Sequence, residues 1–269
     1  MWFDRYMRIK TNEAREICNI VRKHFPYESP WIQHKIIYQN MIKNTDRTSL
    51  DKDVISFHQK ISHNKQKLDS LRNSYQNLTE EPVKYFRELV KALQKYKVQN
   101  CAESARLGYL ASRINGVKDS DVTIGFLTTQ IPYDEEDYND EAFLPLIDKI
   151  LFPLFKFEYG ENINVIDHVV TLIKNHRKKQ IIIDPLLNEV GNIKQVEKIY
   201  ISKYGKELGI EEDEQVNVID SELSFFPKCP KINDEDAKEL GREFEFLVLD
   251  KNKDKINNKK KHFFNFLER

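Results

Sequence analysis

The chain has 269 residues, of which 40% are hydrophobic and 32% are charged. This length suits one large domain or a core with an appendage, and the composition is that of a globular protein. Because 43 basic residues balance 43 acidic ones, the net charge excludes a global electrostatic case for nucleic-acid binding. No stretch approaches the ~20 apolar residues of a transmembrane segment, and no secretory signal is visible.

The chain has three cysteines, and they lie far apart in the sequence. Cys18, Cys101 and Cys229 form no CxxC motif, so the sequence predicts neither a disulfide framework nor a zinc site. We therefore expect no metal, no cofactor and a reducing, cytoplasmic environment.

Residues 1–79 are predicted to be helical. A helix is expected from Thr11–Glu13 to about His24, and a second one over 31–43. Apolar residues at helical spacing over 50–71 predict a long amphipathic helix. Packing of these helices on each other or on the core is favoured over a coiled coil, and the oligomeric state stays open.

Two helices should follow, separated by a short turn. Thr79 and Pro82 are typical of a helix start, and the first helix runs to about Tyr96. Gln99 and Asn100 form the turn. The second helix, 101–114, is rich in small residues that permit close packing, so we expect it at the centre of a domain.

The remainder of the chain is predicted to be mixed. Three β-rich runs, at 121–129, 165–174 and 180–183, predict strands, and the last two should form a hairpin. Further expected elements are an acidic loop at 133–141, helices at 142–152 and 192–203, a strand at 216–219, an apolar segment at 243–249 and a basic tail from 251.

Three residues in this frame have the chemistry of a nucleophile, a base and an orienting group. Cys101 opens a predicted helix, where the helix dipole favours a thiolate and unpaired N–H groups can stabilise an oxyanion. His168 begins an apolar strand run, and Asp184 ends the next one, sixteen residues later. Adjacent antiparallel strands would bring these two side by side. Gln99 and Asn100 are candidate side-chain donors to the oxyanion.

The motifs Asn100-Cys101-Ala102-Glu103, Asp167-His168-Val169 and Asp184-Pro185 resemble those of the transglutaminase-like branch of the papain-like cysteine enzymes. The resemblance covers roughly residues 83–222. It implies an α+β fold in which the nucleophile helix packs on an antiparallel sheet, with Cys101 as nucleophile, His168 as base and Asp184 as the third member. Ala102 and Leu186 depart from the residues that this family often has there.

The resemblance also implies a division of the chain and a class of reaction. The expected parts are a helical N-terminal region (1–79), a transglutaminase-like enzyme domain (80–250) and a basic C-terminal tail (251–269). The expected activity is hydrolysis or acyl transfer at an amide of a protein substrate, by a protease, a glutamine deamidase or a transglutaminase. Several bacterial effectors share the pattern, so translocation into a host cell is an extension of the resemblance.

Structural interpretations compete with the functional ones. Cys101 can be a buried small hydrophobe, His168 a core histidine, and Asp184 the start of a turn. Glu103 is expected to have a structural role, with Arg106 as one possible partner. A catalytically degenerate scaffold that binds a partner, and an enzyme inhibited by residues 1–79, remain alternatives. The basic tail is more readily explained as solvated than as a contact for an anionic surface.

Overall fold

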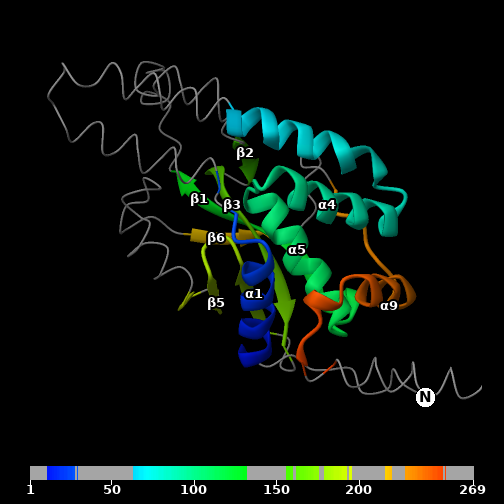
Figure 1. Cartoon of the computed structure of the whole chain (residues 1–269). Coiled ribbons are helices and arrows are strands. Elements are labelled where there is room, and N and C mark those ends of the chain that lie inside the picture. The colour runs from blue at the N-terminus through cyan, green and yellow to red at the C-terminus, as the bar shows by residue number, and fades with distance from the viewer. Residues whose placement is uncertain are drawn as a thin grey trace, which may run out of the picture.

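The computed structural model describes residues 11–27, 29, 63–131, 156–159, 162–175, 179–192, 194–195, 216–219, 228–250 and 252 (Figure 1). Side chains are described for all of these except 127–131, 156–159, 162–167 and 216–219, for which the backbone is described.

The described strands form one antiparallel sheet. They are β1 (Val122–Ile131), β2 (Lys156–Tyr159), β3 (Asn162–Lys174), β4 (Gln180–Asp184), β5 (Glu189–Gly191) and β6 (Val216–Ile219). Their order is β5-β4-β3-β1-β6, and β2 pairs with β3. All of the pairs are antiparallel. The predicted hairpin of β3 and β4 is therefore confirmed, whereas β2 and β5 had not been predicted.

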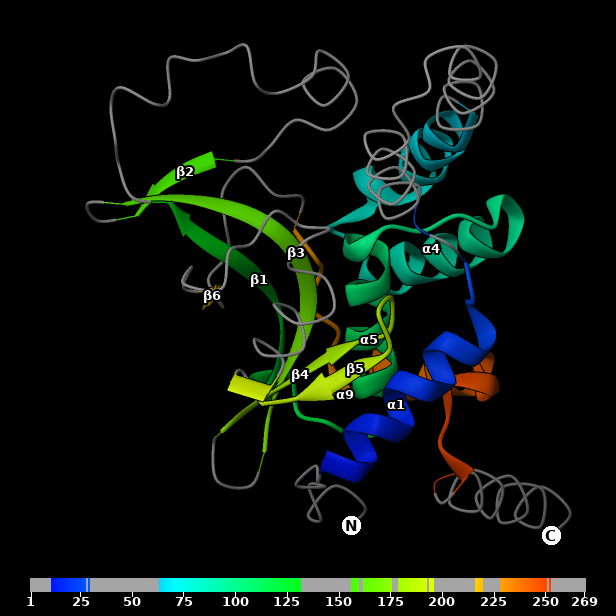
Figure 2. The same cartoon turned by 90° about the vertical axis from the view of Figure 1, so that its left-hand side faces the viewer.

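Helices cover this sheet. They are α1 (Thr11–His24), α4 (Pro82–Tyr96), α5 (Cys101–Ile114) and α9 (Asp234–Glu243), and residues 63–75 are also helical. Short 3-10 turns occupy Gln76–Leu78, Asp119–Asp121 and Glu245–Leu247. In Figure 2, α5 lies against β3 and β4, α4 lies beyond it, and α1 packs beside β4 and β5. The α+β class is confirmed, as is the packing of the helix that begins at Cys101 on an antiparallel sheet.

Helix α5 is the central element of the fold, as its small residues predicted. Every residue from Ala102 to Arg113 is buried. A Cβ added at Gly108 would lie 2.3 Å from Oγ1 of Thr171 in β3. That hydroxyl donates to the carbonyl of Ala105 at 2.7 Å. The glycine therefore leaves the space that the Thr171 side chain of β3 occupies.

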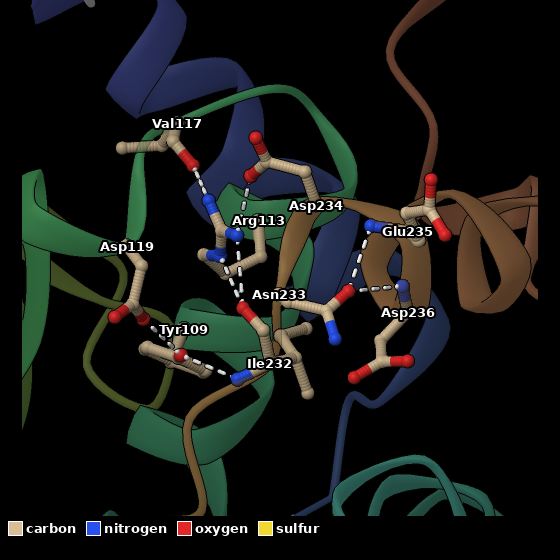
Figure 3. A network of polar contacts seen from close by, with 9 residues as sticks. All are labelled: Tyr109, Arg113, Val117, Asp119, Ile232, Asn233, Asp234, Glu235 and Asp236. Atoms are coloured by element: carbon tan, nitrogen blue, oxygen red, sulfur yellow. Dashed lines mark hydrogen bonds and ion pairs between the residues drawn. The ribbon is translucent and has the colours of Figure 1, made fainter.

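The C-terminal half of α5 is tied to the segment that leads into α9 (Figure 3). The Arg113 guanidinium donates to the carbonyls of Val117 and Ile232 and pairs with Asp234 at 2.7 Å. The Tyr109 hydroxyl accepts from the N–H of Ile232 at 3.2 Å. Because Arg113 is almost fully buried, these bonds compensate for the water that its charge has lost.

Helix α9 had not been predicted, although its start has a clear signal. Asn233 caps the helix, and its Oδ1 accepts the N–H groups of Glu235 and Asp236 at 2.8 and 2.9 Å (Figure 3). An asparagine followed by three acidic residues is a typical helix N-terminus. The apolar segment that follows packs as predicted, since Phe244, Leu247 and Val248 are buried.

The N-terminal region shares its hydrophobic core with the rest of the chain. One cluster of buried residues contains Ile17 of α1, Leu71 of the 63–75 helix, Leu89 of α4, Leu110 of α5 and Ile183 of β4. The described parts of residues 1–79 therefore lie on the same core as the residues beyond the predicted boundary.

Several predictions lie outside the described residues. They are the helices at 31–43 and 142–152, nearly all of that at 192–203, the first part of the 50–71 helix, the acidic loop at 133–141 and the basic tail. Among the helices that are described, none combines the length and the apolar character needed to cross a bilayer.

Candidate catalytic site

His168 and Asp184 form a buried pair on adjacent strands. His168 lies in β3 and Asp184 is the last residue of β4. The ring nitrogen Nε2 of His168 lies 2.7 Å from Oδ2 of Asp184. Their side chains are only 2% and 1% exposed, so water screens the interaction little. The hairpin therefore brings together the two residues that the strand pattern predicted would meet.

An irregularity in the sheet lies directly beside His168. On β1, Leu127 is opposite His168 and Thr128 is opposite Ile166. Asp167 is therefore an extra residue, which makes a β-bulge. A bulge interrupts the alternation of side chains along a strand and can redirect the residue next to it.

The turn after β4 holds the Asp184 carboxylate in place. While Oδ2 faces His168, Oδ1 accepts the N–H groups of Leu186 and Leu187 at 3.1 and 3.2 Å. Both oxygens therefore have partners, and rotation of the carboxylate would break at least one of these bonds.

Helix α1 braces the same turn from outside. The Cys18 thiol lies 3.6 Å from the carbonyl oxygen of Asp184, and Arg22 Nη1 donates to the carbonyl of Leu186 at 3.1 Å. Arg15 donates to the carbonyl of Asn188 at 2.7 Å. Positions 15, 18 and 22 lie on one face of a helix, so a single face of α1 holds the turn that carries Asp184.

Cys101 is brought to the other side of the imidazole. It is the first residue of α5 and is partly exposed. Its thiol lies close enough to the His168 side chain to raise the pKa of that imidazole. Because Nε2 of His168 faces Asp184, a proton taken from the thiol would go to the other ring nitrogen, Nδ1. The structure therefore brings Cys101, His168 and Asp184 together in the order of a nucleophile, a base and an orienting group.

The electrostatics favour a protonated imidazole. Burial alone would lower the pKa of His168, but the charge of Asp184 and the hydrogen bonds to Asp184 and Cys101 outweigh it and raise the pKa to about 10. The imidazole is therefore basic enough to hold a proton at neutral pH.

A capping box at the start of α5 fixes the peptide groups around Cys101. The Asn100 side chain accepts the N–H of Glu103, and the Glu103 carboxylate accepts the N–H of Asn100 at 3.1 Å. These bonds satisfy two of the four N–H groups that a helix start leaves without an intrahelical partner. The remaining two, of Cys101 and Ala102, belong to the residues that an oxyanion at the thiol would approach.

Glu103 has the structural role expected of it, but its ion-pair partner is Arg72. The fully buried carboxylate accepts from Arg72 Nε at 2.9 Å and from the Tyr75 hydroxyl at 2.8 Å. Burial would raise the pKa of Glu103, but the charge and hydrogen bond of Arg72, helped by Arg106 and Tyr75, lower it to about 2. The carboxylate is therefore charged at neutral pH and anchors the first turn of α5.

The two candidate oxyanion donors differ in what they contact. Gln99 is buried, and its Nε2 donates to the carbonyls of Phe25 and Tyr27 at 3.1 and 2.8 Å. Both amide hydrogens of Gln99 are therefore engaged away from the thiol. Asn100 uses its oxygen as an acceptor, from the Ser29 hydroxyl at 2.9 Å and from the N–H of Glu103.

The environments of Cys18 and Cys229 differ from that of Cys101. Burial raises the pKa of Cys18 to about 12, and burial also raises the pKa of Cys229 to about 12. Both are therefore thiols at neutral pH and poor nucleophiles. Cys101 is the cysteine that has an imidazole beside it.

Within the described ranges, no group of three or more potential ligands could hold a metal ion. Comparisons of the chain with protein-family models, with curated proteins and with solved structures find no match. The functional argument therefore depends on the chemistry of the residues that the fold brings together.

Sequence reasoning missed the groups that hold these residues in place. The partners of Glu103 come from the 63–75 helix, and those of the Asp184 turn come from α1. The sequence signal for the Glu103 contacts was the presence of two charged residues, Glu103 and Arg106, in a helix rich in small residues that was expected to be buried. The signal for the contacts of the Asp184 turn, basic residues at 15 and 22 on the face of Cys18, does not reveal which loop they contact.

Proposed function

We propose that this chain is a thiol-dependent amide hydrolase or acyltransferase that acts on a protein substrate. In this proposal Cys101 is the nucleophile, His168 the general base and acid, and Asp184 the orienting carboxylate. The observation that carries it is the contact of a partly exposed thiol at a helix start with a buried His–Asp pair. The resemblance to the papain-like and transglutaminase-like enzymes supports the same roles.

The first half-reaction follows from these positions. His168 takes the thiol proton at Nδ1, and the Cys101 sulfur attacks the carbonyl carbon of the amide. The N–H groups of Cys101 and Ala102, with the Asn100 amide, donate to the oxyanion that forms. Collapse of the tetrahedral intermediate breaks the C–N bond, and the imidazolium protonates the departing amine. A thioester between the acyl group and Cys101 remains.

The second half-reaction depends on the acceptor. Water, activated by His168, attacks the thioester and releases a carboxylic acid and the free thiol, which gives proteolysis or glutamine deamidation. An amine in place of water gives a new amide and hence a crosslink. Hydrolysis of a peptide bond or a side-chain amide is our favoured outcome.

The test is the pH dependence of alkylation of Cys101 by iodoacetamide in the intact protein, followed by peptide mass spectrometry. Cys18 and Cys229 serve as internal controls in the same sample. We expect Cys101 to be modified rapidly at pH 6.5, well below the ~8.5 of a free thiol, and the His168→Gln variant to lose this reactivity. The controls should react slowly below pH 9 in both proteins.

The alternative is a catalytically degenerate scaffold that binds a partner. It requires alkylation of Cys101 to follow the profile of a free thiol and to be unaffected by His168→Gln. That result would refute the proposal. A scaffold also predicts a buried, inert Cys101, whereas Cys101 is partly exposed and the fully buried cysteine is Cys18.

A further inference from the structure

Residues 25–27 and Ser29, which follow α1, are bound to the turn that precedes the nucleophile. Gln99 Nε2 donates to the carbonyls of Phe25 and Tyr27, and the Ser29 hydroxyl donates to Oδ1 of Asn100 at 2.9 Å. Phe25 and Ser29 are both buried. Three hydrogen bonds therefore join a segment from the N-terminal region to the two residues immediately ahead of Cys101.

These bonds constrain how the Asn100 carboxamide points. Its oxygen already accepts the N–H of Glu103 in the capping box. The Ser29 hydroxyl is a second donor to the same oxygen. A flip of the amide would place its nitrogen against the N–H of Glu103, donor against donor, and would force the Ser29 hydroxyl to accept instead of donate, so the nitrogen is held on the opposite side. Within the described part of the chain, that nitrogen makes no hydrogen bond.

We propose that Ser29 is a positioning residue, which sets the Asn100 amide nitrogen as a donor to the oxyanion formed at Cys101. This inference rests on the proposed function. A preorganised donor is more effective than a mobile one, because no reorganisation is required when charge develops. Residues 25–27 and Ser29 therefore act as a brace for the site, in contrast to the inhibitory role considered for residues 1–79.

Two reagents separate this role from a general structural one. Acetylation of Cys101 by p-nitrophenyl acetate forms the S–C bond through a tetrahedral oxyanion and expels p-nitrophenolate. Alkylation by iodoacetamide displaces iodide at a saturated carbon and forms no oxyanion. Loss of an oxyanion donor should slow the first reaction only, whereas a change in access to the sulfur should slow both.

The variants are Ser29→Ala, Asn100→Ala and the double variant, each in the full chain, with both rates measured at Cys101 by mass spectrometry. Asn100→Ala should slow acetylation by about 100-fold, as expected for one oxyanion donor. Ser29→Ala should slow it by roughly tenfold, because the donor remains but is no longer held. In the Asn100→Ala background, Ser29→Ala should have no further effect. Alkylation should stay within about twofold of the wild type.

The matched control is Ser112→Ala. Ser112 is a buried serine of the same helix, and its hydroxyl donates to the carbonyl of Gly108 at 2.6 Å, at the end remote from Cys101. This variant should change neither rate. Ser29→Thr keeps the hydroxyl and should restore acetylation toward the wild-type rate, which tests the inference even where Asn100→Ala fails to fold.

Equal slowing of both reactions by Ser29→Ala, or an undiminished effect in the Asn100→Ala background, would overturn the inference. Failure of the proposed function has a different signature. In that case His168→Gln, in a chain with Ser29 intact, would leave the acetylation rate of Cys101 unchanged.

Discussion

The most quantitative prediction concerns Glu103, whose carboxylate anchors the first turn of α5. Its pKa falls from an ordinary 4.5 to about 2, which corresponds to roughly 3 kcal/mol of stability at neutral pH. Because the pKa of this carboxyl is lower in the folded chain than in the unfolded one, the charged form stabilises the fold. The contribution is complete above pH 4.5 and is lost as the pH falls toward 2.

Glu103→Gln keeps the shape of the side chain and removes its charge. Arg72 and Arg106 then lie beside a neutral amide, so the expected loss at pH 7 is about 3–5 kcal/mol. Because the wild type loses its own carboxylate contribution in acid, the difference between the two proteins should shrink by roughly 2 kcal/mol between pH 5 and pH 3.

The assay is urea unfolding at a series of pH values, followed by circular dichroism. The control is Glu88→Gln, since Glu88 pairs with the exposed Lys91 of α4 at 3.0 Å. That variant should stay within about 0.5 kcal/mol of the wild type. A Glu103→Gln effect that does not change with pH, or no effect at all, would show that the carboxylate is not the source of the stability.

Three further outcomes follow from the packing around the site. Asp184→Asn removes the negative charge that raises the pKa of His168, so that pKa should fall. Alkylation of Cys101 at pH 6.5 should then slow by about tenfold or more, with little change at pH 9.5. Gly108→Ala should lower the free energy of unfolding by roughly 1–3 kcal/mol because its Cβ would meet Oγ1 of Thr171 at 2.3 Å; thermal melting should show that Thr171→Ala in the same chain recovers part of this, and additive losses would contradict the steric explanation. Arg22→Met removes a donor to the turn that carries Asp184 and should reduce the ratio of alkylation rates at pH 6.5 and pH 9.5 by roughly fivefold. The control is Arg87→Met, which removes the ion pairs of α4 with Glu239 and Glu243 of α9 and should leave the ratio unaltered.

Local chemistry explains why some elements could be predicted closely. Helix α5 begins and ends where the sequence indicated, because Asn100 supplies a cap and Asn115-Gly116 a stop. The β3–β4 hairpin followed from two apolar runs on either side of a polar turn. The hairpin placed His168 and Asp184 on adjacent strands as predicted, but Thr171 is opposite Ile183, so the two side chains meet diagonally and not as a directly opposed pair.

Contacts between distant segments could not be predicted in the same way. Gln99 was a candidate oxyanion donor because it lies near Cys101, yet its partners are Phe25 and Tyr27, 74 and 72 positions away. Similarly, Arg72 reaches Glu103 from a helix 31 positions earlier. Spacing along the chain does not encode the crossing of two helices, so only the fold could show where these polar groups would find partners.

The cost of the His168–Asp184 pair bears on the choice between an enzyme and a scaffold. Two ionisable groups that are 2% and 1% exposed have lost nearly all of their water. Burying such a pair seldom adds stability, and well-packed apolar side chains of similar volume often stabilise a core more. A fold that only presented a binding surface would gain from that replacement. Here, in addition, the imidazole lies beside a partly exposed thiol at a helix start, while burial raises the pKa values of Cys18 and Cys229. A pair that costs stability and lies beside a partly exposed thiol is better explained by proton transfer than by packing, and for this reason the enzyme is the hypothesis to test first.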